Sequence, residues 1–298
     1  MNCSKCREII NGKYWTEDNK EYCSSCYEEI RLKCSSCKQN ISGMYYTKDG
    51  SIYCEDCHNN TRLKCDLCNR NIDGKYFKSF EHNICQQCDR THDNCDACNR
   101  YISSLTDGCI EYGDKRKICK ICNKTAVKVR ALYNHFEEIS EFMKSIGFTI
   151  GKYNNIMMMI VMKDQLDQFG DPRGICQYEG KTLNGKIVEQ NFKIKILQGL
   201  PQIAYKGILV HELFHMWVKI NTDDKLSKYQ EEGIANLCQY IYLDKVKQTS
   251  RDSEEIKLSS YIIDSMMKDK DRNYGDGFRE AKSIYDARGI RGIMKYMN

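Results

Sequence analysis

Eight CxxC pairs fill the first 122 residues, and no other feature of the sequence constrains the fold as strongly. The pairs combine into four units that begin at Cys3, Cys34, Cys65 and Cys95, in steps of 31, 31 and 30 residues. Sixteen residues separate the two pairs of each of the first three units, and twenty separate those of the fourth. The sixteen cysteines are Cys3, Cys6, Cys23, Cys26, Cys34, Cys37, Cys54, Cys57, Cys65, Cys68, Cys85, Cys88, Cys95, Cys98, Cys119 and Cys122. Paired CxxC units at a fixed spacing predict four structural zinc sites, each with four thiolate ligands.

The other interpretations of these cysteines fit less well. A disulfide framework needs a secretory context, and the N-terminal sequence has no apolar signal segment. Redox dithiols do not occur as eight pairs in register, and a RING-like cross-brace is disfavoured because each unit repeats whole. The longest apolar run, 156–162, is seven residues, too short to span a bilayer. We therefore expect a cytoplasmic protein without a membrane contact.

Other residues repeat in step with the cysteines. Gly12, Gly43 and Gly74 take equivalent places in the first three units, which predicts a hairpin turn at each. An aromatic pair follows each glycine, at 14–15, 45–46 and 76–77, and is expected to form an apolar plug beneath each metal. A unit of 24 residues buries too little surface to fold alone, so metal binding must supply the folding free energy.

The units resemble LIM zinc fingers, most clearly in the sequence CSSCKQNISGMYYTKDGSIYCEDC at residues 34–57. They differ from LIM domains in two ways: seven residues rather than two separate the first two fingers, and a cysteine replaces the usual histidine ligand. His82 precedes Cys85 by three residues and is an alternative ligand, although a solvated loop histidine is the favoured interpretation, as for His58 and His92. Such fingers predict protein partners.

The formal net charge of +5 counts every thiol as neutral. Four sites of one Zn²⁺ and four thiolates carry 4 × (2 − 4) = −8, which takes +5 to −3, and a catalytic zinc would return it to −1. Residues 1–125 contain 20 Lys/Arg and 18 Asp/Glu, so their +2 becomes −6. The basic character disappears when metal binds, and a nucleic-acid partner is not expected.

The sequence pattern changes at Asn123, after which no CxxC pair occurs. Residues 125–146 have apolar side chains at helical spacing, and 148–162 and 174–197 read as strands, with an Asn184-Gly185 turn in the second. After Pro201 the pattern is helical almost to the end, with breaks near 221–224, 249–252 and 273–277. This predicts an α+β protein: four fingers at about 3–26, 34–57, 65–88 and 95–122 within a region 1–122, then a domain at 123–298 formed by a small sheet and a mostly helical remainder.

The sequence His211-Glu212-Leu213-Phe214-His215 is an HExxH motif within a strongly apolar stretch. Residues four apart share one face of a helix, so His211 and His215 can bind one metal ion. Glu212 then lies beside the ion, where its carboxylate can act as the catalytic base. The motif predicts a catalytic zinc site.

The third ligand is expected among two carboxylates, sixteen and seventeen residues after His215. Glu232 is favoured because Asn236 lies one helical turn later, where it can orient a ligand histidine. Glu231 remains the alternative; it has Ala235 at that place. The segment also resembles the EGxA ligand segment of gluzincin aminopeptidases.

An oxyanion donor is also needed for peptide hydrolysis. The candidates are Tyr240, Tyr261, Tyr274 and Tyr285. Tyr274 is the one we select. Cys176 and Cys238 are expected to be buried apolar residues, and Met157 to Met159 to form a core strand.

Four motifs together identify a family resemblance. HELFHMW with EEGIAN, the preceding GLPQIAYKGIL, the upstream PRGICQYEG and the later YGDGFREA resemble the plant DA-one family of LIM-domain metallopeptidases, which limit organ size. The resemblance covers roughly residues 130–295, and the LIM-like array in front matches in kind. It implies a zinc endopeptidase that cleaves regulatory proteins, with His211 and His215 as ligands and Glu212 as base. The Lys/Asn/Ile-rich composition favours a bacterial relative. Because the first finger begins at Cys3, no room is left for the ubiquitin-interacting helices of plant members, and ubiquitin dependence is not expected.

Two functions follow from these observations. The first is a zinc-dependent endopeptidase that uses its fingers for substrate docking or regulation. The second is a zinc-finger adaptor for protein interaction beside a catalytically silent peptidase fold. The intact HExxH motif and the third carboxylate favour the enzyme.

Overall fold

The chain divides into two compact units in the computed structural model, which describes residues 1–151, 155–168, 173–183, 186–222 and 225–297. The first unit comprises Met1–Lys78 with His82–Cys88, and the second comprises Ser79–Glu81 with Asp89–Asn298. The four fingers, the helices and the small sheets confirm the predicted α+β class. None of the described helices is both long enough and apolar enough to cross a membrane.

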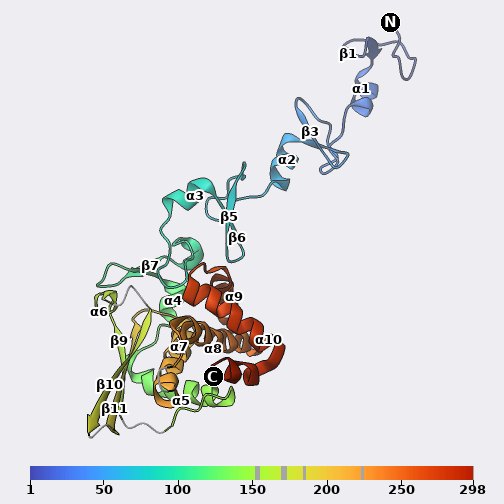
Figure 1. Cartoon of the computed structure of the whole chain (residues 1–298). Coiled ribbons are helices and arrows are strands. Elements are labelled where there is room, and N and C mark those ends of the chain that lie inside the picture. The colour runs from blue at the N-terminus through green and yellow to red at the C-terminus, as the bar shows by residue number, and fades with distance from the viewer. Residues whose placement is uncertain (152–154, 169–172, 184–185, 223–224, 298) are drawn as a thin grey trace. The chain divides into compact units, whose positions relative to one another are not determined.

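Fingers one to three share one local structure. A CxxC turn is followed by a two-stranded antiparallel hairpin, and the second CxxC pair lies at the start of a short helix (Figure 1). The elements are β1 (Trp15–Glu17), β2 (Lys20–Tyr22) and α1 (Ser24–Ile30); β3 (Tyr45–Lys48), β4 (Ser51–Cys54) and α2 (Glu55–Thr61); and β5 (Tyr76–Ser79), β6 (His82–Cys85) and α3 (Gln86–Thr91). This arrangement brings the two pairs of each finger together.

Two expectations about these fingers are wrong in detail. The glycines that recur at equivalent places of the fingers, such as Gly12, have positive φ but precede the hairpin. The first hairpin turns at Asp18 and Asn19 instead. The aromatic pairs do not all form a plug: only the second aromatic is partly covered in the first two fingers, and Tyr76 and Phe77 of the third finger are both exposed. Trp15 stacks on Tyr27 at 5.7 Å, whereas Tyr14 is half exposed to solvent.

The fourth finger belongs to the second unit. It contains β7 (Cys109–Glu111), β8 (Lys117–Cys119), the helix α4 (Lys120–Lys124) and an additional 3-10 turn, η1 (Ser104–Thr106). Ser103 caps this turn and accepts a hydrogen bond from the Leu105 backbone N–H. The four extra residues between the two CxxC pairs of this finger therefore make room for a defined turn. The predicted boundary between 122 and 123 stays a prediction, and the contacts group residues 89–122 with the rest of the second unit.

The first long helix after the fourth finger is shorter than predicted. A 3-10 turn, η2 (Val129–Ala131), leads into α5 (Leu132–Ser145), which ends before Gly147. Thr125 instead caps α4, and residues 126–127 pair with the chain before α7, because Ala126 bridges to Pro201 and the Val127 N–H donates to the Leu200 carbonyl. Backbone pairing thus takes precedence over the helical pattern there.

A three-stranded sheet follows, in the order β10-β11-β9. Strand β9 (Ile156–Val161) is parallel to β11 (Lys186–Leu197), and β10 (Gly174–Leu183) is antiparallel to it. A short helix, α6 (Asp164–Asp167), follows β9. The predicted strand region 174–197 is confirmed by β10 and β11, whereas only 156–161 of the predicted 148–162 is a strand and residues 148–151 are not. The predicted Asn184-Gly185 turn lies outside the described residues. Within the predicted Met157 to Met159 core strand, Met158 is buried and Met157 is exposed.

Four long helices complete the second unit: α7 (Gln202–Asn221), α8 (Lys228–Thr249), α9 (Ser253–Lys268) and α10 (Gly277–Tyr296). A π-helical turn, η3 (Arg272–Asp276), precedes α10. The breaks agree with those predicted, although the last is a continuous turn into α10. Helix α7 contacts α8, β10 and α5 and lies at the centre of the unit (Figure 1).

Helices α8 and α10 cross at a pair of glycines. A Cβ on Gly233 would lie 2.5 Å from the backbone carbonyl of Gly277, which is closer than atoms can approach. The absence of side chains therefore permits the crossing and fixes where η3 lies relative to α8, with which it is in contact.

Candidate functional site

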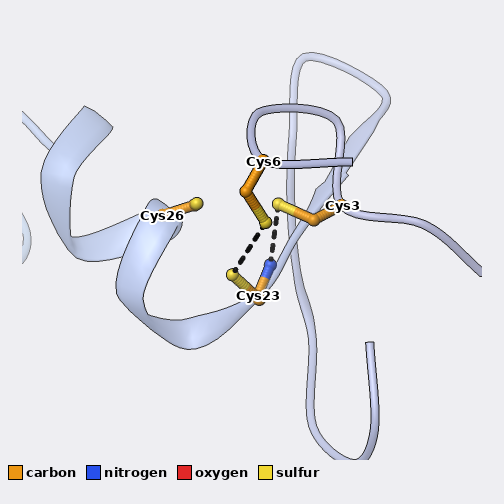
Figure 2. A group of neighbouring side chains, drawn as sticks. All are labelled: Cys3, Cys6, Cys23 and Cys26. Atoms are coloured by element: carbon orange, nitrogen blue, oxygen red, sulfur yellow. Dashed lines mark hydrogen bonds between the residues drawn. The ribbon is translucent and has the colours of Figure 1, made fainter. Parts of the chain in front are cut away.

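Each finger gathers its own four thiols. The sulfur atoms of every predicted group lie within 4.8 Å of one another, which supports self-contained closure of each finger. Figure 2 shows the first group, in which Cys3, Cys6 and Cys23 converge from the turn and hairpin and Cys26 comes from α1. All sixteen cysteines are free thiols. Four close sulfur atoms on a short hairpin fit the tetrahedral preference of Zn²⁺.

Backbone geometry favours the thiolate form of the first cysteine in the first two groups. Burial raises the pKa of Cys3, but hydrogen bonds from backbone N–H groups, beginning with that of Cys23, lower it to about 6. The equivalent Cys34 has the same balance and a pKa of about 6. A metal ligand must be deprotonated, so this polar cradle suits a bound cation.

The remaining histidines and cysteines lie outside these groups. His82 Nδ1 lies 3.7 Å from Asp66, and His58 stacks on Tyr46 at 4.1 Å. Cys238 is fully buried, as expected, and Cys176 is partly buried at the edge of the cleft described below.

Helix α7 presents both histidines of the HExxH motif toward one point. Almost the whole helix is buried, which explains why its sequence is apolar on every side. The Nε2 atoms of His211 and His215 lie 3.1 Å apart, and their Nδ1 atoms point away to other partners.

Helix α8 brings Glu232 to the same point. Its Oε2 atom lies 3.3 Å from Nε2 of His211 and 3.4 Å from Nε2 of His215. That oxygen is buried and accepts no hydrogen bond. Two imidazole nitrogens and a buried carboxylate oxygen without a donor form a donor set that fits a divalent transition metal.

Asn236 and Glu231 hold the two rings. Asn236 Oδ1 lies 3.0 Å from His211 Nδ1, while its Nδ2 donates to the Tyr274 carbonyl at 2.9 Å. This is the place that the sequence predicted for Asn236. Glu231 Oε1 lies 2.7 Å from His215 Nδ1 and is not part of the three-residue cluster.

The part that Glu231 plays in this geometry was missed by the sequence reasoning, which weighed it only as an alternative ligand. Adjacent residues on a helix point about 100° apart, so two neighbouring glutamates cannot both face the same point. One of the pair faces the shared centre and the other reaches the ring of His215 from the side. The Glu-Glu doublet itself was the available signal.

Glu212 is buried between α7 and the start of β10. A Cβ on Gly174 would lie 2.9 Å from Glu212 Oε1, so only glycine leaves space for the carboxylate. Burial raises the pKa of Glu212, while the neighbouring histidines and the backbone N–H of Cys176 act in the opposite direction. A carboxyl with a raised pKa is suited to accept a proton and return it.

Tyr274 is the one of the four candidate tyrosines that lies on η3. Its ring stacks near His211 at 6.3 Å, and burial together with Glu232 raises the pKa of its hydroxyl. Tyr261 also lines the cleft, whereas Tyr240 and Tyr285 pack against the hydrophobic core. The geometry thus brings Tyr274 to the cluster.

These residues open into a cleft of about 1250 Å³. Its lining comes from α7, α8, α9, η3, the first residues of β10 and the first CxxC turn of the fourth finger. A cleft of this size admits several residues of an extended polypeptide.

Known proteins resemble this chain over both its finger region and the region that contains the HExxH helix. Residues 144–256 match a family model described as "DA1-like: Protein DA1". The chain is 22% identical over 311 residues to Protein DA1 of Arabidopsis thaliana, an alignment that covers 72% of this chain and 57% of that protein.

Two further relatives show the same pattern. The chain is 24% identical over 319 residues to LIM domain-containing protein HDR3 of Oryza sativa subsp. japonica, covering 72% of this chain and 62% of that protein. It is 21% identical over 315 residues to Protein DA1-related 1 of Arabidopsis thaliana, covering 72% and 56%. The chain thus spans less than two thirds of the length of these relatives. The predicted resemblance to the plant DA-one family is confirmed, and with it a LIM-like finger region beside a DA1-type domain.

Proposed function

We propose that this chain, which resembles the DA-one proteins in both its finger region and its DA1-like region, is a zinc-dependent endopeptidase. The observation that supports the proposal best is the convergence of His211, His215 and Glu232 around one point, with Glu212 buried beside it. An adaptor with a silent peptidase fold would have no use for a buried carboxylate oxygen without a hydrogen-bond donor.

The donor set would hold Zn²⁺, which when bound acts as a Lewis acid that lowers the pKa of water and polarises a carbonyl group. Four further zinc ions would occupy the finger sites. The protein's own contribution is orientation: Asn236 fixes the ring of His211 and Glu231 that of His215, so both Nε2 atoms face the centre.

Glu212 would carry the proton. Its carboxylate accepts the proton of the attacking water and delivers it to the amine that leaves when the peptide bond breaks. Its burial excludes bulk water and keeps its pKa raised, so that the same group can both accept and donate. The hydroxyl of Tyr274 is the proposed donor to the oxygen that gains charge in the transition state.

Strand β10 provides a place for the polypeptide. It is an edge strand of the described sheet, and its first residues, Gly174 to Cys176, line the cleft beside Glu212. An extended peptide can pair with such an edge through backbone hydrogen bonds. The proposed substrate is therefore a protein segment in extended conformation, cleaved in the cytoplasm.

Glu212→Gln tests the proposal directly. The variant should retain all its zinc, because Glu212 is not in the ligand cluster, and should lose at least about a hundredfold in cleavage rate, the usual contribution of a positioned acid–base group. The measurement is proteolysis of denatured casein, followed by mass spectrometry, with zinc counted by elemental analysis. Equal cleavage by Glu212→Gln and the unmodified protein would reject the endopeptidase.

The two neighbouring glutamates provide a matched pair. Glu232→Gln should lose the catalytic zinc together with activity. Glu231→Gln should keep the zinc but bind it about 10–100-fold more weakly, as is usual when a residue that orients a ligand is changed. Competition with a zinc chelator measures both affinities. The opposite order of the two variants would make Glu231 the ligand.

A further inference from the structure

The active-site cleft has one wall that the peptidase half does not supply. Asn94, Cys95, Asp96, Ala97 and Asn99 line the same cleft as the HExxH residues. These residues form the first CxxC turn of the fourth finger. Asn94, Asp96 and Asn99 are exposed, and Asn94 Nδ2 donates to Asn99 Oδ1 at 2.9 Å. The finger therefore turns a pair of amides toward the cleft, with the Asp96 carboxylate beside them, whose Oδ2 accepts a hydrogen bond from the Lys117 backbone N–H at 2.6 Å.

Arg173 joins this turn to the catalytic strand. Its Nη1 donates to the Ala97 carbonyl at 3.1 Å and its Nη2 to the Asp96 carbonyl at 3.2 Å. The next residue is Gly174, where a Cβ would lie 2.9 Å from Glu212 Oε1. One arginine thus connects the loop between Cys95 and Cys98 to the backbone beside the catalytic base.

Two buried arginines of the finger hold it on other sides. Arg100 donates to Glu254 of α9 at 2.8 Å, and its guanidinium lies 3.9 Å from the centre of the Phe80 ring. Arg116 Nη1 donates to the Gln198 carbonyl at 2.8 Å. A surface fixed on three sides cannot leave the cleft without breaking charged hydrogen bonds.

We propose that the fourth finger is part of the substrate-binding site, where Asn94 and Asn99 contact the bound polypeptide and contribute to the choice of cleavage site. The inference rests on the proposed endopeptidase function and adds a specificity-determining surface to it. The chemistry that this wall offers is amide hydrogen bonding beside one carboxylate, Asp96, that the Lys117 backbone N–H already engages, so the wall takes polar side chains or backbone groups of the substrate.

Opposite charges placed at one position of this wall provide the test. In the full chain, Asn94→Asp should favour peptides with Lys or Arg near the scissile bond, and Asn94→Lys should favour Asp or Glu there. Both variants change the hydrogen bond between residue 94 and Asn99, so that change alone would alter the two cleavage profiles in the same way. Opposite changes can come only from the opposite charges. The probe is a library of randomised decapeptides, with cleavage sites mapped by mass spectrometry. The preference ratio should differ between the two variants by about threefold or more, the size expected for one charge at several ångströms near water.

The matched control lies in the first finger. Asn2 precedes Cys3 as Asn94 precedes Cys95, and the two make equivalent bridges, to Ile9 and Tyr101. Asn2 belongs to the other compact unit. Asn2→Asp and Asn2→Lys should leave the cleavage profile unchanged.

Each outcome decides between the two proposals. Opposite shifts at Asn94 and none at Asn2 support the cleft wall. A protein that cleaves normally with the same profile in both Asn94 variants overturns this inference alone. If the unmodified protein cleaves no more than Glu212→Gln, the endopeptidase falls and the substrate wall falls with it.

Discussion

The first three fingers and the fourth finger use one cysteine pattern in two environments. In the first finger Cys6 is exposed, and residues such as Tyr14 remain half exposed. In the fourth finger all four cysteines are buried, as are Arg100 and Arg116. The difference teaches that a metal motif fixes a local fold but not its use. The residues around the motif decide whether a finger is a separate module or part of a larger core.

The additional residues of the fourth finger account for part of this difference. Its twenty-residue spacing makes room for η1, and its hairpin carries Asp114 and Arg116 toward the sheet. Asp114 Oδ2 accepts from the Lys163 backbone N–H at 3.1 Å, after β9. Burial raises the pKa of Asp114, but the hydrogen bonds and charge of Arg116 and the Lys163 backbone N–H together outweigh it and lower that pKa.

Removal of whole fingers should give the largest effect. A chain that begins at Asp89 loses residues 79–81 of the second unit, including the Phe80 ring against Arg100, but keeps the fourth finger with its bonds to α9 and the sheet. It should still fold and cleave short peptides within about twofold of the full protein if the first three fingers serve to dock substrates. A chain that begins at Asn123 should aggregate or unfold, because it exposes the buried surface beneath the fourth finger. The measurements are kcat/KM on a quenched peptide and calorimetric unfolding.

Two outcomes would change this interpretation. If kcat/KM for the short peptide were about tenfold or more higher in the chain that begins at Asp89, the first three fingers would inhibit the enzyme rather than dock its substrate. A chain from Asn123 with an unchanged unfolding transition would remove the distinction between the two kinds of finger.

Loss of a single finger metal should give the next largest effect. Cys95→Ser should lower the unfolding temperature of the second unit by about 10 °C or more, since a structural zinc site supplies several kcal/mol to folding. Cys34→Ser should unfold the second finger and leave the second unit's transition unchanged. Differential scanning calorimetry with elemental analysis distinguishes the two. Equal effects would mean that all four fingers are joined to the catalytic unit in the same way.

Single charged contacts should give the smallest effects. Arg116→Ala should cost the second unit about 2–4 kcal/mol, because it leaves Asp114 buried without its partner. The control is Lys5→Ala in the first finger, where the pair with Glu29 is largely exposed to solvent and its loss should leave the unfolding midpoint unchanged. Denaturant unfolding of each unit measures both values. A cost below about 1 kcal/mol for Arg116→Ala would show that the fourth finger is as loosely held as the first.

Local pattern was sufficient to predict most of this molecule. The cysteine spacing predicts the four thiol clusters, and HExxH predicts the convergence of His211 and His215, because both depend on residues a few positions apart. Glu232 could be selected because its helical neighbour Asn236 had to reach a histidine. In each case the decisive geometry belongs to one helix or one hairpin.

Long-range contacts explain what the sequence did not reveal. The bond between Arg173 and the Ala97 carbonyl joins residues 76 positions apart, and that between Arg100 and Glu254 joins residues 154 apart. Neither a helical nor a strand periodicity in the sequence indicates which distant residue such an arginine contacts. The same limit applies to the segment at Ala126, whose pairing with Pro201 overrides its helical pattern.

The glycine crossing of α8 and α10 has a consequence for protein engineering. Replacing helical glycines by alanine is a common route to thermal tolerance, worth about 1 kcal/mol per site in an exposed helix. At Gly233 and Gly277 the same replacement would push two helices apart and carry Tyr274 away from Glu232. A redesign guided by consensus or helix propensity must therefore keep both glycines, because the two helices can approach this closely only where neither residue has a side chain.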